Sequence, residues 1–185
     1  MKKGGFGYIR FMRKRTFIHM LILFIIAFGI FFAGKIMYPD YSTMFSITAI
    51  VVCIPASMRT VSFIMFMIHK GADKELFDEI SPLAGDIPLF YDSVITTAEK
   101  SYDVNVFALT HEQIIGYSPK KGKDLKKLEE HLKEMAFKNG FKSSNVKIFT
   151  DTGKFKMRLE KLSSDFKEKD ESDDALYNLI GNLSL

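Results

Sequence analysis

The chain contains a single cysteine, Cys53, among its 185 residues. One cysteine excludes an intramolecular disulfide bond and any cysteine-rich metal site. Cys53 also lies inside an apolar run, and burial in apolar surroundings disfavours the reactive thiolate. We therefore expect no cysteine chemistry, and the composition fits a soluble part that resides in the cytosol.

Motifs for common catalytic sites are also missing. Gly116 and Gly122 lack the Gly-Lys-Ser/Thr arrangement of a Walker loop, and no strand-turn-helix nucleophile elbow accompanies the Ser, His and Asp residues. His111, Glu112 and His131 are a conceivable metal site, but three scattered ligands without a motif are more typical of surface residues. The sequence thus predicts no bound metal or cofactor.

Acidic residues are absent from residues 1–15, a stretch that carries six basic ones: Lys2, Lys3, Arg10, Arg13, Lys14 and Arg15. Residues 71–185, in contrast, hold 17 Lys and Arg against 21 Asp and Glu. The net charge of +4 and the pI near 9.0 therefore come from segments beside the apolar runs. A basic pI can indicate nucleic-acid binding, but this distribution argues against a nucleic-acid partner.

Two long apolar runs occupy the first third of the chain. In residues 16–37 only His19 is ionisable between Phe17 and Gly34, and about 20 apolar residues cross the hydrocarbon core as a helix. A secretory signal peptide has a shorter apolar core, about 7–15 residues. A second run, residues 43–69, follows closely. We predict a two-helix transmembrane hairpin with an interfacial extension over residues 16–70, embedded in the lipid bilayer.

The six basic residues of the tail, residues 1–15, predict the orientation of the hairpin. Segments rich in Lys and Arg stay on the cytosolic side of a membrane, and the loop 38–42 has no excess of basic residues. Both termini should therefore be cytosolic, in a multi-pass protein of the cell membrane. Lys far outnumbers Arg and Trp is absent, a bias that fits an A/T-rich bacterial genome.

Two ionisable residues, Arg59 and His19, lie within the apolar runs, and their position in the bilayer can be predicted. An arginine at the bilayer centre costs at least about 2.5–3.5 kcal/mol, so we expect Arg59 near the cytosolic headgroups as an anchor that snorkels. A functional intramembrane charge is the alternative. The segment 61–69 then either continues the helix or lies along the interface. His19 is expected to be a neutral interfacial residue.

After residue 70 the pattern predicts a cytosolic α/β domain over residues 71–163. We expect a helix at 73–81, strands at 89–97, 104–110 and 114–118, a crossover helix at 123–139 and a strand at 146–150. Residues 99–103 should form a turn, and Asn139-Gly140 should end the crossover helix, with Phe141 packing back on its last turn. Residues 154–163 fit strand and helix spacing alike, and a helix is favoured, giving the order α-β-β-β-α-β-α.

The last segment, residues 164–185, combines an acidic linker with an apolar end. The acidic run 167–174 should be solvated. Residues 175–185 place Leu176, Leu179, Ile180 and Leu183 on one helical face. We expect this face to dock on the domain. A helix that binds a partner or the membrane, and a strand, are the alternatives.

This element order resembles the core of the restriction-endonuclease-like fold, and local sequence resembles its nuclease-related branch, NERD. The resemblance covers roughly residues 72–162. It is carried by the strands Val104–Leu109 and Ile114–Lys120, the helical step Glu130-His131-Leu132 and the strand Val146–Thr150. The whole chain also resembles uncharacterised two-span bacterial membrane proteins that share Ile-Pro-Ala-Ser, here 54–57, and Lys-Ile-Phe-Thr-Asp, here 147–151.

The nuclease resemblance implies a catalytic site that this chain has eroded. Such nucleases hold Mg²⁺ with two acidic side chains, because hard oxygen ligands suit this ion, and a lysine helps to activate water. The matching positions here are Asn105, Ser118 and Lys120, so only the lysine survives. An active nuclease would need acids at new positions, for which the candidates are Asp92, Asp103 and Glu112.

We therefore expect a membrane-tethered module that binds a protein partner, or assembles with membrane subunits including copies of itself, without catalysis. The alternative is a membrane-anchored, Mg²⁺-dependent nuclease with relocated acids. A DNA binder should gather Lys120, Lys121, Lys123, Lys126 and Lys127 into one positive rim. A plain helical surface would intersperse them with Glu129, Glu130 and Glu134. A third possibility, a small transporter or channel subunit, is limited by having only two spans.

Overall fold

The computed structural model of the protein describes residues 2–97, 100–110, 113–119, 125–141, 145–166 and 171–184. The chain divides into two compact units. The hairpin unit comprises Ile9–His69. The globular unit comprises Lys70–Leu185 together with the N-terminal residues Met1–Tyr8.

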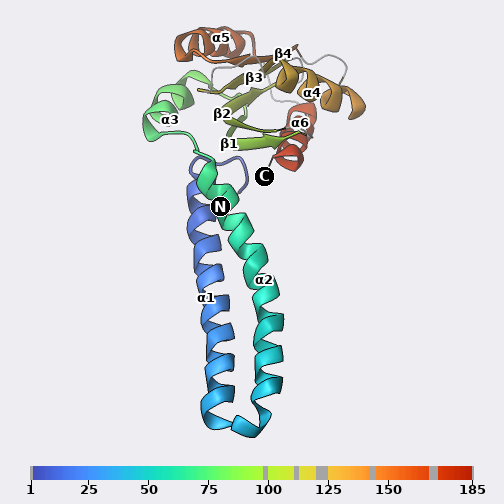
Figure 1. Cartoon of the computed structure of the whole chain (residues 1–185). Coiled ribbons are helices and arrows are strands. Elements are labelled where there is room, and N and C mark those ends of the chain that lie inside the picture. The colour runs from blue at the N-terminus through green and yellow to red at the C-terminus, as the bar shows by residue number, and fades with distance from the viewer. Residues whose placement is uncertain are drawn as a thin grey trace. The chain divides into compact units, whose positions relative to one another are not determined.

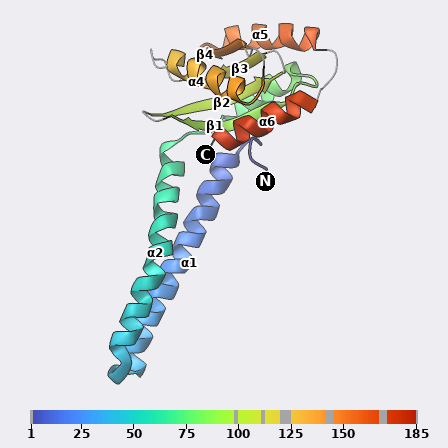
Figure 2. The same ribbon diagram turned by 90° about the vertical axis from the view of Figure 1, so that its right-hand side faces the viewer.

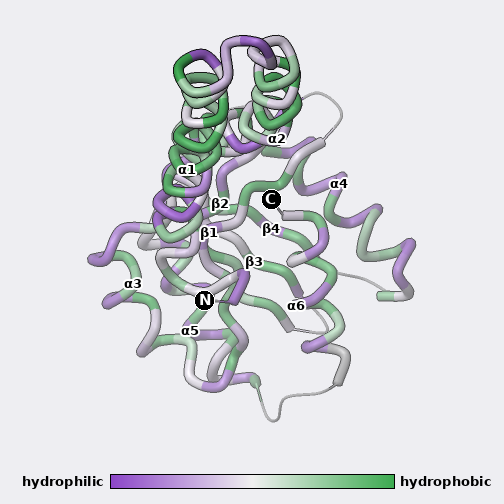
Figure 3. Tube along the Cα trace, turned by 90° about the horizontal axis from the view of Figure 1, so that it is seen from below, coloured by the Kyte–Doolittle hydropathy of each residue, from purple (hydrophilic) through white to green (hydrophobic). Residues whose placement is uncertain are grey.

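The hairpin unit consists of two long helices, α1 (Tyr8–Met37) and α2 (Ser42–Ile68), joined by the short 3-10 helix η1 (Pro39–Tyr41) (Figure 1). Both helices are long and apolar enough to cross a membrane, and hydrophobic residues follow each other along both (Figure 3). The predicted pair of long apolar helices is thereby confirmed, and their insertion in a membrane stays a prediction. Pro55 lies within α2 without ending it, and residues 61–68 continue the helix.

Small residues bring the two helices of the hairpin together. Ala27 and Gly34 on α1 are buried and seven residues apart, and so are Ala49 and Ala56 on α2. A seven-residue repeat keeps one side of a helix turned toward its partner, and small residues let membrane helices approach closely. A Cβ atom at Gly34 would collide with Phe45, so this position requires glycine.

Arg13 ties the start of α1 to the end of α2. Its Nε donates to the carbonyl oxygen of Phe66 at 3.0 Å, and its Nη2 donates to that of His69 at 3.1 Å. The last carbonyls of a helix lack intrahelical partners and carry partial negative charge. The guanidinium therefore caps α2, a role that the count of basic residues could not reveal.

A ring contact between the helices locates Arg59 within the hairpin. Phe17 packs against Phe63 with centroids 5.3 Å apart, at the start of the apolar part of α1. Arg59 is four residues nearer the connecting turn, which is about 6 Å at the helical rise. Its side chain is exposed, and its role as an interfacial anchor stays a prediction.

The globular unit is built on a four-stranded sheet in the order β1-β2-β3-β4. The strands β1 (Leu89–Thr96), β2 (Ser101–Leu109) and β3 (Gln113–Tyr117) are antiparallel neighbours, and β4 (Asn145–Phe149) pairs in parallel with β3. A parallel pair requires a crossover, which α4 (Leu125–Lys138) supplies. The predicted meander, crossover helix and fourth strand are confirmed.

Helices cover both faces of this sheet (Figures 1 and 2). One core packs α4 and α6 (Glu171–Leu183) against the sheet, and its members include Leu128, Leu132, Leu176 and Ile180. The other core packs α3 (Lys74–Ile80) and α5 (Thr152–Asp165), with η2 (Ser81–Leu83) beside them, through residues that include Ile80, Phe155 and Leu159. The helix favoured at 154–163 and the docked C-terminal segment are both confirmed.

The structure corrects the turn that was predicted at residues 99–103. The strand β2 begins at Ser101, because Ser101 pairs with Thr96 and Tyr102 pairs with Ile95. Tyr102 is 6% exposed and belongs to the core on the α4 side. The polar character of the neighbouring residues suggested a longer turn than the cross-strand pairing allows.

The structure also corrects the solvated linker that was predicted at residues 167–174. The helix α6 already begins at Glu171, and Asp173 is fully buried. Carboxylates in the first turn of a helix are favoured by the partial positive charge there. Residues 171–174 of the acidic run thus form the first turn of α6, while residues 167–170 lie outside the described residues.

Candidate functional site

Asn105 and Ser118, which stand where the nuclease resemblance expects an acidic pair, come together in the sheet. The register joins Val106 to Tyr117 and so places Asn105 across from Ser118. Ser118 is 1% exposed and Asn105 is 8% exposed. The Ser118 Oγ donates to the carbonyl oxygen of Asp103 at 2.7 Å. The Ser118 hydroxyl therefore fastens the end of β3 to β2.

Asp92, one of the candidates for a relocated acid, anchors a connection. Its Oδ1 accepts a hydrogen bond of 2.6 Å from the backbone N–H of Ala72. A Cβ atom at Gly71 would lie 2.6 Å from the same oxygen, so glycine is required beside it. Asp92 is 2% exposed and has a φ of 54°, a conformation uncommon for any residue but glycine. This strained acid fixes residues 71–72 against β1.

The remaining candidate ligands do not form a metal site in the part of the chain that the structure describes. There, no group of three or more His, Cys, Asp and Glu side chains is arranged to hold a metal ion. Asp103 is buried on β2 and His131 is half-buried on α4. Two of the predicted rim residues, Lys126 and Lys127, are exposed on α4. The other predicted ligands and rim residues lie outside the described residues: Lys120, His111, Glu112, Lys121 and Lys123.

Both ends of the chain cover the β1 edge of the sheet. The N–H of Tyr91 donates to the carbonyl oxygen of Gly4 at 2.7 Å, and Ser184 forms an isolated antiparallel bridge with Ile95. The two ends also meet each other, because Lys3 Nζ donates to the carbonyl oxygen of Ser184 at 2.6 Å. An unpaired strand edge invites other chains, and the chain's own termini close this one.

The N-terminal contact depends on a glycine. Gly4 has a φ of 84°, and a Cβ atom there would lie 2.5 Å from the Tyr177 hydroxyl and 2.6 Å from the Phe90 ring. The Tyr177 hydroxyl donates to the carbonyl oxygen of Lys3 at 3.2 Å. Burial raises the pKa of Tyr177 and lowers the pKa of Lys3, as expected for groups partly removed from water.

The opposite edge of the sheet, at β4, borders a pocket of about 380 Å³. We call it the β4 pocket. Four elements contribute to it: β3, β4, α4 and α5. Its lining residues are Gln113, Ile115, Glu129, Lys133, Asn145, Val146, Lys147, Phe149 and Arg158. In Figure 1, β4 lies at the end of the sheet between α4 and α5.

The β4 pocket has an excess of positive charge. Three cations, Lys133, Lys147 and Arg158, face a single carboxylate, Glu129. The Glu129 Oε1 accepts from the N–H of Ile148 at 2.8 Å and lies 3.7 Å from the Lys147 ammonium. Glu129 therefore satisfies one amide at the sheet edge and partly neutralises one lysine.

The other two cations of the β4 pocket are less neutralised. Arg158 donates through Nη2 to the Gln113 side-chain oxygen, a neutral partner. Lys133 is exposed and forms no hydrogen bond or ion pair with the described residues. The pocket is thus a positive site in a part of the chain whose net charge is negative.

Two large apolar side chains are exposed on the helices that contribute to the β4 pocket. Phe137 is 75% exposed and lies four residues beyond Lys133 on α4, while Met157 is 65% exposed and precedes Arg158 on α5. They are the only large hydrophobic side chains so exposed in the described part of the globular unit. Phe137 adjoins the pocket residue Lys133 on the same side of α4, because residues four apart on a helix are neighbours.

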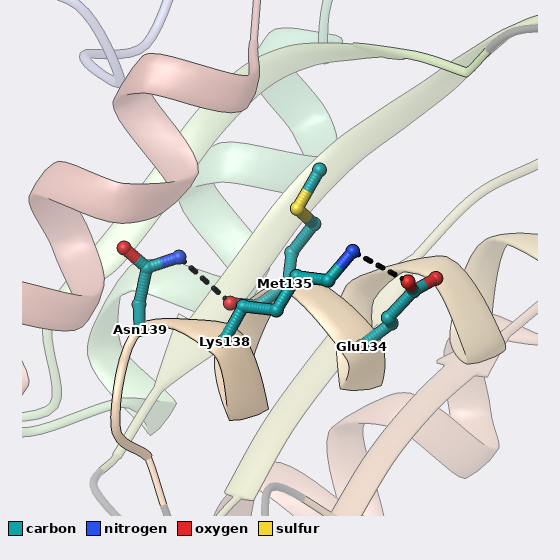
Figure 4. Close-up of polar contacts among 4 residues, drawn as sticks. All are labelled: Glu134, Met135, Lys138 and Asn139. Carbon is teal, nitrogen blue, oxygen red and sulfur yellow. Dashed lines mark hydrogen bonds and ion pairs between the residues drawn. The ribbon is translucent and has the colours of Figure 1, made fainter.

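The end of α4 that carries Phe137 is fixed by local polar contacts (Figure 4). Lys138 Nζ donates to Glu134 at 2.7 Å, and Asn139 Nδ2 donates to the carbonyl oxygen of Met135 at 2.8 Å. The hydrogen bond and charge of Lys138 lower the pKa of Glu134. Gly140 has a φ of 87°, and the next residue, Phe141, bonds back to α4 and packs on the core. The predicted helix end is confirmed.

The hairpin unit holds an apolar groove of about 260 Å³. Its walls are Phe24, Ala27, Phe28, Phe31, Ser46, Ala49, Ile50 and Cys53. Ala27 and Ala49 are also interface residues, so the groove arises where small side chains leave space between large ones. Cys53 is half-buried in this wall.

Sequence reasoning missed the β4 pocket. One signal was available: β4 alternates between exposed Asn145 and Lys147 and buried Val146 and Ile148, which is typical of a strand with one covered face. The convergence of Arg158 with α4 depends on the sheet order, and no local motif encodes it.

Comparisons of this chain with protein-family models, with curated proteins and with solved structures find no match.

Proposed function

We propose that this protein is a membrane-tethered, cytosolic interaction module without catalytic activity, and that its partner docks over the β4 pocket. The observation that carries the proposal is the position of Phe137. It is 75% exposed and lies one turn beyond the pocket residue Lys133 on the same side of α4. Apolar anchors beside polar groups are the usual anatomy of a protein–protein interface.

The state of the nuclease positions supports the absence of catalysis. Ser118 is engaged with the β2 backbone and Asp92 with the backbone of Ala72, so each has a structural task. A Mg²⁺ site needs carboxylate oxygens that are open to the ion and to a substrate phosphate. The two apolar helices support the tether, because a hairpin of this length and hydropathy would hold the module at the bilayer.

Site-specific crosslinking in native membranes tests this proposal. A photoreactive phenylalanine at position 137 should give a discrete crosslinked adduct of larger mass. The matched control is the same residue at Glu75, which is exposed on α3. Absence of an adduct at 137, together with purification of this chain alone in mild detergent, would reject the interaction module.

A second candidate is a diverged restriction-endonuclease-like domain that retains nuclease activity. The element order, with β4 parallel to β3, supports this fold, and the buried Asp103 beside the Asn105–Ser118 pair is the observation that favours activity. The full chain should then cleave plasmid DNA with Mg²⁺ or Mn²⁺ and lose that activity in Asp103→Asn and Lys120→Ala. Cleavage that needs both residues would replace the interaction module as the proposed function.

A further inference from the structure

We propose that the β4 pocket binds an acidic segment of a partner protein, with carboxylate side chains paired to Arg158 and Lys133. This inference rests on the proposed function and names the chemistry of its partner. It concerns the side chains of the partner segment, because the contacts at the β4 edge argue against an added strand.

The excess of positive charge in the β4 pocket favours an anionic ligand. Lys133 has no partner among the described residues, Arg158 is paired with a neutral amide, and only Lys147 has a carboxylate within 4 Å. The sequence from 71 to 185 has more acidic than basic residues, so this local excess of positive charge differs from its surroundings. Complementary charge at an interface raises the rate of association and suppresses wrong partners.

Arg158 is placed to recognise a carboxylate group. A guanidinium carries five N–H donors in a planar fork, and the hydrogen bond to Gln113 uses one of them while restricting the side chain. Arg158 is also half-buried, which reduces solvent screening. A planar fork that is held in place matches the two oxygens of a carboxylate.

The exposed Phe137 favours a protein segment over a small anion. A free phosphate or a small acid would be satisfied by the cations alone and would leave Phe137 exposed to water. A segment of several residues could pair its carboxylates with Arg158 and Lys133 and bury an apolar side chain against Phe137. Because Lys133 and Phe137 are four residues apart on one helix, they lie on neighbouring turns of the same side.

The β4 edge itself is protected against strand addition. Glu129 occupies the N–H of Ile148, and the exposed Lys147 stands on the edge strand. A charged lysine on an edge strand discourages pairing with another strand. The partner segment should therefore be recognised by its side chains without continuing the sheet.

The test uses the full chain in nanodiscs of neutral phosphatidylcholine, so that anionic lipid does not compete. The probe is a fluorescein-labelled ten-residue peptide that alternates Glu with Leu and Phe, and the control peptide has Gln in place of Glu. Fluorescence anisotropy should show saturable binding of the acidic peptide. This binding should weaken as salt rises, and the Gln peptide should bind at least about tenfold more weakly.

Variants of the chain locate the binding. Lys133→Gln and Arg158→Gln should each lower the affinity for the acidic peptide about fivefold, as expected for a partly exposed charge pair. Phe137→Ser should lower the affinity for both peptides. Lys161→Gln and Lys126→Gln remove the same charge from α5 and α4 outside the pocket lining and should leave binding unchanged. Because Lys133 is exposed, Lys133→Gln leaves the fold intact and keeps the test decisive.

Three results would overturn the inference. They are equal binding of the Gln peptide, equal loss in the Lys161→Gln control, and complete competition by inorganic phosphate at the concentration of the peptide. Each of them is distinguishable from failure of the proposed function. In such a case a crosslinked adduct at position 137 would still establish a partner, whereas loss of that adduct as well would remove both.

Discussion

The two edges of the sheet are completed in different ways. At β1 the chain's own backbone covers the edge, through Gly4 on Tyr91 and Ser184 on Ile95. At β4 a single side chain, Glu129, satisfies an edge amide, and charged residues surround a pocket. One edge is closed by main-chain contacts and the other is only protected by charge.

This difference separates stability from recognition. Closure at β1 brings together residues that are nearly the whole chain apart, as the hydrogen bond from the Lys3 side chain to the Ser184 carbonyl oxygen shows, so it should contribute to folding. Protection of an edge by charged side chains prevents unspecific pairing and leaves the surface available to a partner. Substitutions at β1 should therefore affect stability most, and substitutions at β4 should affect binding.

The largest effect is expected for Phe90→Ala. Phe90 is 1% exposed and packs on Tyr177 with ring centroids 5.0 Å apart. Removal of such a ring costs about 3–5 kcal/mol of unfolding free energy. Phe149→Ala, at the half-buried end of β4, is the matched control and should cost less. Chemical unfolding of the full chain, followed by tyrosine circular dichroism, measures both, and an equal loss would contradict the comparison.

The next effect is expected for Gly4→Val, which should detach the N-terminal residues from β1. The positive φ of Gly4 and the close approach of Tyr177 and Phe90 leave no unstrained place for a side chain. A cost of about 1–3 kcal/mol follows from strain at such a position. Hydrogen exchange should accelerate at the Tyr91 amide.

The control for Gly4→Val is Gly5→Ala, whose new Cβ atom would meet, among the described residues, only the Lys2 carbonyl oxygen, at 3.2 Å. Protection at Tyr91 should then be largely kept. If Gly4→Val also leaves the Tyr91 amide protected, the N-terminal residues do not hold the β1 edge in solution.

Most of the fold was predictable because its elements have strong local signals. The nearly continuous apolar run in 104–109, the amphipathic spacing in α4 and the Asn139-Gly140 helix end each specify a local structure. The predictions failed where long-range pairing decides the structure. Tyr102 is in a strand because Ile95 lies opposite, and Asp173 is buried by the docking of a helix whose first residues look like a linker.

The candidate site was less predictable, for a physical reason. The residues of the β4 pocket come from four elements, and each looks like an ordinary surface residue in its own segment. Arg158 and Lys133 line the same pocket only because two helices pack on opposite faces of the sheet. The resemblance directed attention to Asn105 and Ser118, of which Ser118 donates a hydrogen bond to the β2 backbone. A motif search compares positions along the chain and does not detect residues that come together only in the fold.

A smaller effect is expected at the other edge for Glu129→Ala. This substitution removes the carboxylate from the Ile148 amide and should cost about 1–2 kcal/mol, because an edge amide loses a charge-assisted bond. Exchange should accelerate at Ile148 and leave Tyr91 unaffected. The loss of a negative charge from the β4 pocket should also raise the affinity for the acidic peptide. Glu134→Ala, in an exposed ion pair on the same helix, should change neither amide.

The smallest effect at neutral pH, and the most specific, is expected for Tyr91→Phe. Burial raises the pKa of Tyr91 to about 12, and its hydroxyl has no hydrogen-bond partner within the described structure. Phenylalanine removes this unsatisfied group without breaking a bond, so stability at pH 8 should be unchanged or higher. Tyr177→Phe, in contrast, removes the hydrogen bond to Lys3 and should lower the stability at pH 8.

At alkaline pH the unfolding free energy should change differently in the Tyr91→Phe variant and in the unmodified protein. Between about pH 10, the pKa of an ordinary tyrosine, and pH 12, the unfolded chain ionises this group while the folded chain keeps it neutral. The unfolded state then binds fewer protons, so the unfolding free energy must fall as pH rises through this window. Melting temperatures at pH 8 and pH 11 should therefore differ more for the unmodified protein than for Tyr91→Phe, and the contribution of Lys3 cancels because both proteins carry it. Equal differences would mean that the Tyr91 hydroxyl is open to water and that β1 is less closed than the structure shows.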